Sequence, residues 1–196
     1  MRDLILVRIS SKQLWQYLRH NKLLYDADMA SVLMKACTET MDRIGAKLAY
    51  LSMKEAVFFI APKVTEWQDD FRLVSASASA FASIVNQKIK ISDQLFTVYA
   101  DLIKHQETKP IIDFINRTTY EAMGAAKAQI KEKMSDRYAD VSLESIPSIY
   151  TRGICVAKNY ETHEFDTYIS QLPKEVFQQK LGKYVNTINQ GWVRVA

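Results

Sequence analysis

The sequence has few of the cysteines that stabilise very small secreted proteins as disulfides. It has none of the long apolar runs that cross membranes. It contains only 2 cysteines, Cys37 and Cys155, which lie far apart and outside any Cys-x-x-Cys pair. This spacing argues against a disulfide framework, a structural zinc and a redox dithiol. No apolar run approaches the length of about 18 residues that a spanning helix needs, and the first residues lack the features of a signal peptide. We therefore expect a cytoplasmic protein in a reducing compartment, without membrane association.

Glycine and proline are scarce as well, at 5 and 4 of 196 residues, and the chain has no linker, repeat or low-complexity segment. We therefore predict a single domain over residues 1–196. A large excess of one charge is also missing, since 26 Lys and Arg stand against 22 Asp and Glu, giving +4. The basic residues are spread among acidic ones, with the densest stretch at Arg8, Lys12, Arg19, His20 and Lys22. This stretch is typical of a solvated helix face, and a phosphate-binding edge is the alternative.

The first half of the chain alternates short apolar runs with longer amphipathic ones. Leu4 to Ile9 predicts a buried strand, and a helix is expected from Ser11 to His20. Asp26 or Asp28 can cap a second helix that Gly45 ends. The segments 46–52 and 55–61 predict two strands joined as a tight hairpin through Met53-Lys54. The next helix carries an apolar stripe at Phe71, Val74, Ala78, Phe81 and Val85.

The second half predicts further strands and helices in the same alternation. Strands are expected over 94–100 and 150–157, and Pro110 suits the first turn of a helix between them. That helix has apolar positions at Ile111, Ile115, Ala122, Met123, Ala126 and Ile130. From about residue 160 we expect a helical extension, in which Pro173 opens a helix with Phe177, Leu181, Tyr184 and Ile188 facing inward. The order predicts an α+β fold, an antiparallel or mixed sheet of about four to five strands with helices on one face.

Local motifs that would identify an activity are absent. The sequence has no dinucleotide or P-loop glycine pattern, no His-Glu-x-x-His and no nucleophile elbow. The three histidines, His20, His105 and His163, are isolated in polar contexts and are interpreted as surface residues. Local chemistry alone therefore predicts no reaction.

Six short segments, in the same order, resemble motifs of the tRNA-histidine guanylyltransferase family. They cover most of the chain up to about residue 157. VRISSKQLWQYL, from Val7, is similar to that family's strand ending in Arg-Ile-Asp-Gly-Arg and the aromatic-rich helix after it. The helix with Leu33, Met34 and Cys37 resembles its Leu-Met-x-x-Cys helix, and AYLSMKEAVFFI, from Ala49, its Asp-Glu hairpin. FASIV from Phe81, FINRTTY from Phe114 and SIYTRG from Ser148 resemble its Phe-Ala-Ser helix, its His-Ile-Asn-Asn helix and its Met-Tyr-Arg-Lys-Gly strand start.

The resemblance implies a polymerase-palm, ferredoxin-like architecture and a reaction at a tRNA 5′ end that uses two Mg²⁺ ions. Such ions lie about 3.5–4 Å apart and need carboxylate oxygens as ligands. At the matched positions this chain has Ser10 for the strand's Asp, Ser11 for its Gly, and Lys54-Glu55 for the hairpin's Asp-Glu. A hydroxyl supplies no charged ligand, and an ammonium repels a divalent cation. The resemblance therefore implies that the fold is retained and that the metal ligands are lost. We expect no tight Mg²⁺ binding and no cofactor.

The remaining matched positions predict an anion-binding alternative. The family's histidine in the first helix corresponds to Trp15, the basic residue before Phe-Ala-Ser to Arg72, and the first Asn to Asn116. Trp15 and Tyr17 are interpreted first as core aromatics, and Lys54 as an exposed turn residue beside Glu55. The functional alternative is that Lys54 takes the place of the metal and binds a phosphate directly, with Lys12 and Arg72 beside it. The candidate site is therefore Ser10, Ser11, Lys12, Lys54, Glu55, Arg72 and Asn116.

Three functional hypotheses follow from this. The leading one is a catalytically degenerate relative that binds GTP or ATP, RNA or tRNA, or a protein partner, and that forms a homo-oligomer or co-assembles with an active relative. The first alternative is an active tRNA 5′-end nucleotidyltransferase with relocated metal ligands, drawn from Asp3, Glu55 and Asp93. The second alternative is a purely structural or inhibitory interaction protein that uses the fold as a scaffold.

Overall fold

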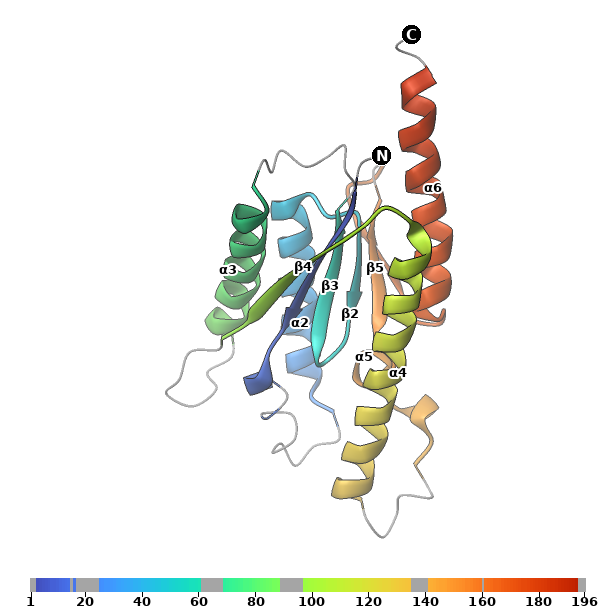
Figure 1. Cartoon of the computed structure of the whole chain (residues 1–196). Coiled ribbons are helices and arrows are strands. Elements are labelled where there is room, and N and C mark those ends of the chain that lie inside the picture. The colour runs from blue at the N-terminus through green and yellow to red at the C-terminus, as the bar shows by residue number, and fades with distance from the viewer. Residues whose placement is uncertain are drawn as a thin grey trace.

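The computed structural model describes residues 3–14, 16, 25–60, 69–88, 97–134, 141–159 and 161–193 (Figure 1). Its centre is a six-stranded sheet in the order β4-β1-β3-β2-β5-β6, and every neighbouring pair is antiparallel. The strands are β1 (Leu4–Ser10), β2 (Leu48–Leu51), β3 (Glu55–Ile60), β4 (Tyr99–His105), β5 (Ile154–Lys158) and β6 (Phe165–Tyr168). The helices are α2 (Ala27–Ile44), α3 (Asp70–Lys88), α4 (Thr108–Lys133), the short α5 (Ser148–Thr151) and α6 (Pro173–Val193), with a 3₁₀ turn η2 (Leu143–Ser145). The predicted α+β class is confirmed.

Helix α2 begins and ends where its local sequence signals lie. The Asp26 carboxylate accepts the backbone N–H of Met29 at 3.0 Å, which satisfies one of the donors left open in the first turn. Gly45 follows the last turn with φ 68°, a left-handed conformation that costs glycine little. The predicted capping of this helix is confirmed, with Asp26 as the N-cap.

The predicted hairpin is also confirmed, and the hydroxyl of Ser52 organises its turn. Strands β2 and β3 pair with Leu51 opposite Ala56, and the Ser52 backbone N–H donates to the Glu55 carbonyl at 2.9 Å. The Ser52 hydroxyl accepts the backbone N–H groups of Lys54 and Glu55, each at 3.3 Å. Local hydrogen bonds therefore fix the positions of Lys54 and Glu55 relative to the end of the sheet.

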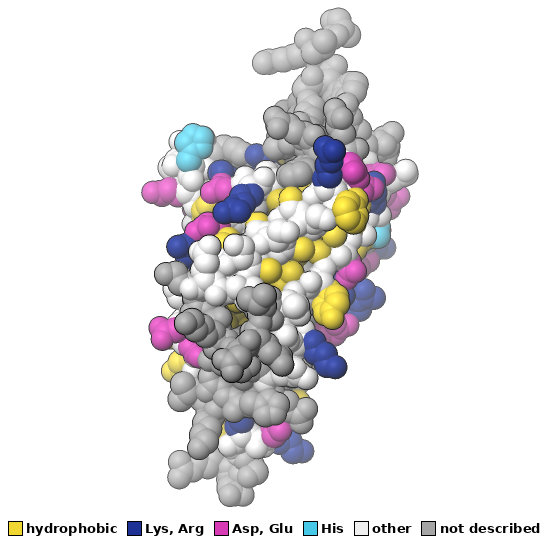
Figure 2. All heavy atoms as spheres, turned by 90° about the vertical axis from the view of Figure 1, so that its left-hand side faces the viewer, with side chains coloured by type: hydrophobic (Ala, Val, Ile, Leu, Met, Phe, Trp, Pro, Cys, Tyr) yellow, Lys and Arg dark blue, Asp and Glu magenta, His cyan; other side chains and the backbone are white. Residues whose placement is uncertain are grey.

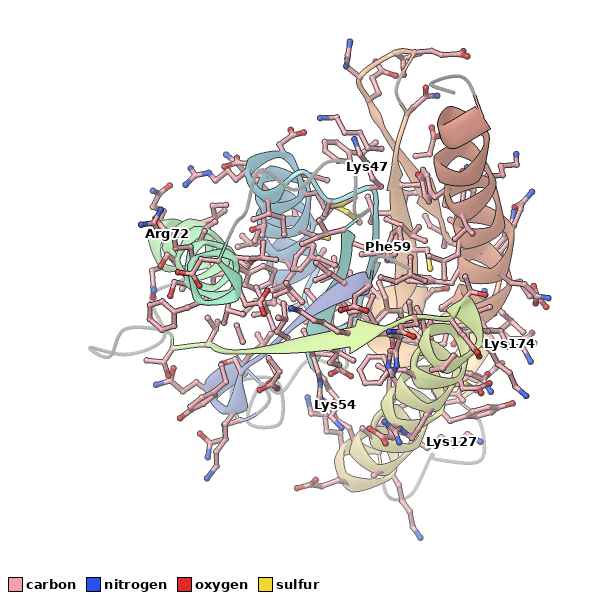
Figure 3. All side chains as sticks on the ribbon, turned by 45° about the horizontal axis from the view of Figure 1, so that its top comes forward. Lys47, Lys54, Phe59, Arg72, Lys127 and Lys174 are labelled. Carbon is pink, nitrogen blue, oxygen red and sulfur yellow. The ribbon has the colours of Figure 1, made fainter. Side chains whose placement is uncertain are left out.

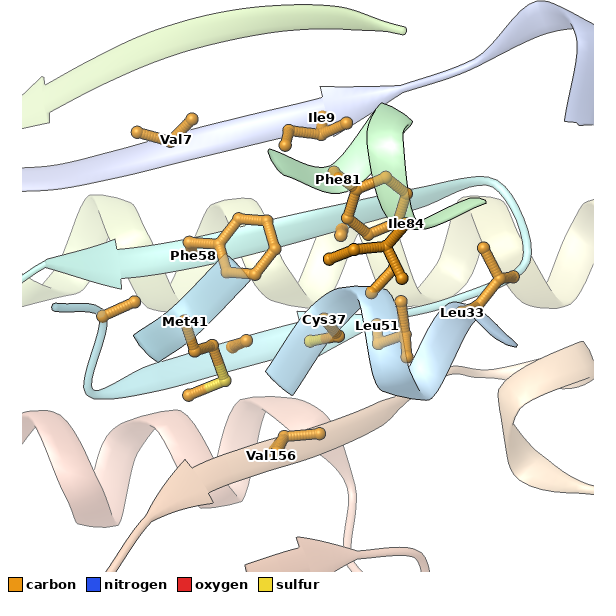
Figure 4. Packing of buried hydrophobic residues seen from close by; sticks show 14 of the residues in the cluster. Val7, Ile9, Leu33, Cys37, Met41, Leu51, Phe58, Phe81, Ile84 and Val156 are labelled. Atoms are coloured by element: carbon orange, nitrogen blue, oxygen red, sulfur yellow. The ribbon is translucent and has the colours of Figure 1, made fainter. Parts of the chain in front are cut away.

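Helices cover both faces of the sheet, so the expectation of helices on one face is wrong. On one face α2 and α3 pack Leu33, Cys37, Met41, Phe81 and Ile84 onto alternate strand residues such as Phe58 (Figure 4). On the other face α4 and α6 pack Ile111, Ile115, Phe177 and Leu181 onto the intervening residues, such as Leu6 and Phe59 (Figure 1). The central strands have to bury both sets of side chains, which is why β3 reads as a continuous apolar run after Glu55.

The edge strands differ most from the expectations. The strand expected over 94–100 is β4, which begins at Tyr99 and pairs with β1 along its whole length, while residues 94–96 lie outside the described part. The strand expected from Tyr150 begins at Ile154, because Tyr150 lies in α5. Strand β6 was not predicted and brings the number of strands to six. Both β4 and β6 mix charged and apolar residues, so their composition does not distinguish them from loops.

Two helical expectations also change. The buried side of α3 carries Leu73, Ser77, Ala80, Phe81, Ile84 and Val85. Phe71, expected on that stripe, is 76% exposed, because it precedes the buried Leu73 by two residues, about 200° around the helix, and so lies on the opposite side. The helical segment expected from about residue 160 begins at Pro173, after strand β6, and its Phe177 and Leu181 are fully buried as predicted. Within the described residues, no helix is both long and apolar enough to cross a membrane.

Candidate functional site

Three of the predicted site residues meet at one end of the sheet. Ser10, the last residue of β1, lies directly opposite Glu55, the first residue of β3, and on its other side opposite Tyr99, the first residue of β4. Lys54 precedes Glu55 in the hairpin turn and is half-buried. The structure thus brings Ser10, Lys54 and Glu55 together, as the resemblance implies.

An ion pair that was not predicted occupies this end of the sheet. Arg8 donates from Nε to the Glu55 carboxylate, and only 6% of the Glu55 side chain is exposed, against 36% of that of Arg8. Both side chains leave the sheet on the α4/α6 face, because Leu4 and Leu6, which alternate with Arg8 along β1, pack there. The guanidinium therefore neutralises the one carboxylate of the hairpin that the resemblance keeps.

The sequence gives no local signal for this pair. Arg8 and Glu55 are far apart in the chain, in the two segments that resemble the family's first strand and its hairpin, and that resemblance does not indicate a pair between them. Only the register of β1 on β3, with Arg8 opposite Val57 and Ser10 opposite Glu55, sets the two side chains diagonally on one face. The same register places Asp101 of β4 opposite Arg8, and this exposed acid was not predicted either. Among the described residues, no three acidic, histidine or cysteine side chains form a group that could hold a metal ion.

The Tyr50 side chain is packed in the core beside the ion pair. Its side chain is fully buried, and its hydroxyl donates to the carbonyl of Arg152 at 3.0 Å. Burial raises the pKa of Tyr50, and the nearby Glu55 charge adds to this, so the phenol stays protonated. Gly153 allows this packing, since a Cβ there would lie 2.4 Å from Cε2 of the ring, at φ +80°. The site end of the sheet is therefore rigid on the α4/α6 side.

The predicted residues Ser11 and Lys12 have different surroundings. The Ser11 side chain is buried, and its hydroxyl donates to the Thr97 carbonyl at 2.8 Å and accepts the backbone N–H of Leu14 at 3.3 Å. These bonds cap the short helical turn after β1 and tie it to the start of β4. Lys12 is exposed on that turn. Ser11 thus has a structural task, while Lys12 is open to an approaching anion.

The hollow at this end of the sheet is small. It is lined by the polar residues Ser10, Ser11, Ser52, Lys54 and Glu55 and by apolar residues that include Leu14, Leu33 and Phe81. Its volume of about 210 Å³ includes the part open to solvent. The space enclosed by the protein is smaller still, and it is too small to enclose a nucleotide. A ligand as large as a nucleotide would therefore have to lie mostly outside the hollow.

Arg72 is not part of this site. It lies in the first turn of α3, 79% exposed, with Asp69 at 3.9 Å (Figure 3). The neighbouring Asp70 binds Lys104, which belongs to the end of β4 that pairs with Ile5. Ser10 is five residues further along β1, or about 17 Å away at the rise of a strand. In Figure 3, Arg72 and Lys54 lie well apart, so the predicted grouping of these two cations does not form.

The other predicted residues are placed as follows. Asn116 is half-buried on α4, between Ile115 and Thr119, which are buried against the sheet. Asp3, a ligand candidate of the enzymatic alternative, precedes β1 at the end of the sheet opposite to Ser10. Trp15, Tyr17 and Asp93 lie outside the described residues. The described residues thus bring neither Asp3 nor any second predicted carboxylate to Glu55.

A wider and more open hollow lies where β4 leads into α4. It measures about 970 Å³ including solvent-open space, and its lining mixes bases, acids and one aromatic ring: His105, Glu107, Lys109, Pro110, Asp113, Phe114 and Arg117. Arg117 lies 5.7 Å from the centre of the Phe114 ring and 4.0 Å from Glu121. The mixture of charges favours no single class of ligand, and the sequence does not single out this hollow.

Comparison with known proteins identifies the fold. No family model matches the chain, and no curated protein matches it in sequence. A bacterial tRNA(His) guanylyltransferase-like protein in complex with GTP matches with a TM-score of 0.70 at 17% identity, over 94% of this chain and 90% of the other. A structure of the same description in complex with ATP has a TM-score of 0.65 at 16% identity, over 92% and 88%. The tRNA(His) guanylyltransferase of Saccharomyces cerevisiae has a TM-score of 0.56 at 12% identity, over 88% and 91%. The chain has the fold of these proteins, and the resemblance inferred from its sequence is confirmed at that level.

Proposed function

We propose that this chain is a catalytically degenerate relative of the tRNA(His) guanylyltransferases that binds the triphosphate of a nucleotide or of an RNA 5′ end without a metal ion. The observation that carries the proposal is the ion pair of Arg8 with the buried Glu55, which lies where the resemblance implies a metal site. The solved structures of this fold in complex with GTP and with ATP support the choice of ligand.

Electrostatics at the end of the sheet supports the loss of the metal. A Mg²⁺ ion needs charged oxygen ligands in near-octahedral geometry. Here Ser10 is neutral, the Glu55 charge is balanced by Arg8, and Lys54 adds a positive charge from the turn. Two like unit charges 4 Å apart repel by about 4 kcal/mol at an effective dielectric of 20. The same field that repels a cation attracts a phosphate, so anion binding takes the place of metal binding.

The ligand-binding role falls mainly to Lys54 and Lys12. Lys54 stands in a turn fixed by the Ser52 hydroxyl, so its backbone does not have to be ordered on binding. Lys12 is exposed two residues after Ser10 and brings a second cation from the neighbouring strand end. The Ser10 hydroxyl and the Asn116 amide can donate further hydrogen bonds to phosphate or sugar oxygens. Arg72 has no part in this binding, which makes it the matched control.

The test is a binding titration with GTP, with ATP and with a 5′-triphosphorylated RNA oligonucleotide, each in Mg²⁺ and in EDTA. Binding of at least one ligand is expected to persist in EDTA and to weaken as salt screens the contact. Lys54→Ala should weaken binding by about tenfold, or about 1.4 kcal/mol, whereas Arg72→Ala should leave it unchanged.

Other outcomes identify the alternatives. If binding or nucleotide addition disappears in EDTA and with Glu55→Gln, while Lys54→Ala has no effect, metal-dependent catalysis has survived and the degenerate assignment is wrong. If none of the three ligands binds under either condition, the fold serves as a scaffold for a protein partner. Circular dichroism of each variant must match that of the wild type for these results to count.

A further inference from the structure

Part of the α4/α6 face of the sheet is left open beside the proposed ligand site. Leu6 of β1 and Ile103 of β4 lie opposite each other and belong to the apolar packing under α4, where Leu6 is fully buried. Two residues nearer the Ser10 end of β1, 36% of the Arg8 side chain is exposed. In Figure 1, α4 and α6 lie on the β5 side of the sheet, and among the described residues no helix crosses in front of the start of β4. The helical cover of this face therefore ends between Leu6 and Arg8.

Tyr99 and Asp101 of β4 share this open area with Arg8 and Ser10. In the register of β4 on β1, Asp101 lies directly opposite Arg8, and Tyr99 lies opposite Ser10. Alternate residues of a strand face the same side, and Ile103, the next in this series, packs against the α4/α6 cluster. Asp101 is exposed and Tyr99 is 67% exposed. Figure 2 shows exposed hydrophobic side chains on this β4 side of the molecule. We call Arg8, Ser10, Tyr99 and Asp101 the open corner of the sheet.

The charges of Arg8 and Asp101 are not matched to each other. Opposite charges that lie directly across two strands ordinarily pair and stabilise the sheet. Here Arg8 donates from Nε to Glu55, which lies on the strand at the other side of β1, and no ion pair joins Arg8 to Asp101. Among the described residues, neither the two terminal nitrogens of Arg8 nor the Asp101 carboxylate has a hydrogen-bonding partner. The buried Glu55 thus orients Arg8 and leaves its remaining donors beside an acceptor in the open corner.

We propose that the open corner binds a nucleobase, and that its donors and its acceptor select guanine. The Watson–Crick edge of guanine has two neighbouring N–H donors, on N1 and N2, next to the acceptor O6. The Asp101 carboxylate accepts from both N–H groups, and the terminal nitrogens of Arg8 donate to O6. The exposed Tyr99 ring supplies a surface on which the base stacks, as aromatic side chains do for unpaired bases.

The other bases match this arrangement less well. Adenine has a donor at N6 but an acceptor at the neighbouring N1, which the carboxylate repels. Cytosine has one donor at N4, and uracil has one donor at N3 between two acceptors. Only guanine offers a carboxylate two donors side by side. Asp101 therefore sets the choice of base, while stacking on Tyr99 strengthens the binding of every base.

The open corner lies within reach of the phosphate-binding residues of the proposed function, on which this inference rests for the position of the phosphates. Strand β3, which begins directly after Lys54, is two strand spacings away from β4, or about 10 Å. The sugar of one nucleotide bridges such a distance, so the triphosphate lies at Lys54 and Lys12 while the base lies on Tyr99. The contacts to the base use neither lysine, so the two halves of the site can be tested separately.

Titration of the full chain with GTP, ATP, CTP and UTP in EDTA tests the choice of base. The wild type should bind GTP at least about tenfold more tightly than the other three, because a bidentate contact to a base discriminates by about that factor. Asp101→Asn replaces one acceptor by a donor, the pattern that suits adenine, so it should remove the preference by weakening GTP binding alone. Tyr99→Ala should weaken the binding of all four by about tenfold. Asp113→Asn, the same substitution at an exposed position of α4, is the matched control and should change nothing.

Lys54→Ala separates this inference from the proposed function, because it should weaken all four triphosphates and leave the preference for GTP unchanged. Triphosphates that bind in EDTA without a preference for GTP, or a preference that Asp101→Asn does not alter, would overturn the guanine site and leave the proposed function intact. If no triphosphate binds, titrations with GMP and AMP at millimolar concentration decide. Binding of GMP but not AMP that Asp101→Asn abolishes supports the guanine site even then, and any other result overturns it.

Discussion

The two faces of the sheet differ in what they bury. Under α2 and α3 the strands bury only apolar side chains, such as Val7, Ile9 and Phe58. Under α4 and α6 the apolar cluster is similar in kind, but it adjoins the buried phenol of Tyr50 and the ion pair of Glu55. The comparison teaches that the α2/α3 face contributes apolar packing, including the apolar lining of the hollow, while the α4/α6 face gives up apolar packing at one end to hold an ion pair and a phenol.

The largest expected effect is on the apolar face. Phe58 is fully buried, with its ring 6.4 Å from that of Phe81. Phe58→Ala removes this packing and leaves a cavity, so the free energy of unfolding should fall by about 3–5 kcal/mol. Urea denaturation measures this change. Tyr120→Ala, at a largely exposed tyrosine, is the control and should change it by no more than about 0.5 kcal/mol. Equal losses in both variants would contradict the division between core and surface drawn above.

A smaller loss of stability is expected on the α4/α6 face, where Gly153 packs against the buried Tyr50 ring. Gly153→Ala forces a residue with a Cβ into a left-handed conformation and against the Tyr50 ring. Strain and overpacking together should lower the free energy of unfolding by about 2–4 kcal/mol. Gly182→Ala, on α6 with nothing near the added Cβ, is the matched control and should be neutral or slightly stabilising. A crystal structure of Gly153→Ala with an unmoved Tyr50 ring would contradict this explanation.

The smallest expected effect on stability comes from the ion pairs, and it should be larger for the pair with the buried carboxylate than for the pair with the exposed one. Glu55→Gln leaves the Arg8 guanidinium facing a neutral amide in a buried setting and should cost about 1–3 kcal/mol. The pair of Lys158 with Asp42 has a carboxylate that is 50% exposed, so Asp42→Asn should cost no more than about 1 kcal/mol. Thermal unfolding of the two variants side by side measures the difference. If Asp42→Asn costs more, burial of the Glu55 carboxylate is not what gives the Arg8 pair its strength.

The parts of the fold that follow from local signals could be predicted from the sequence. Asp26 and Gly45 bound α2 because their roles depend on neighbouring residues only, and the hairpin follows from two apolar runs around a short turn. Strands β4 and β6 lie at the edges of the sheet, where polar residues are tolerated, so their composition does not distinguish them from loops. Coverage of both faces depends on how α4 and α6 return to the sheet, which no local pattern specifies.

The candidate site divides in the same way. Ser10, Lys54 and Glu55 could be grouped because the resemblance places them at two adjacent strand ends. Arg72 could not be excluded from the sequence, because its distance from Lys54 depends on the direction in which α3 crosses the sheet. Arg8 could not be included, because its pairing with Glu55 depends on a register between segments that are far apart in the chain.

The strand order has a consequence for how the chain leaves the ribosome. The four adjacent strands β4-β1-β3-β2 and both helices of one face lie within the chain up to His105. A nascent chain of that length already has the parts for a sheet covered on one side, and domains tend to form from the N-terminus as they emerge. Leu6, Val57 and Phe59 on the opposite side then have no cover until α4 is made, and the cover is complete only when Phe177 and Leu181 follow. Between these two moments the growing polypeptide exposes a broad apolar β-surface, which is the kind of surface that chaperones bind.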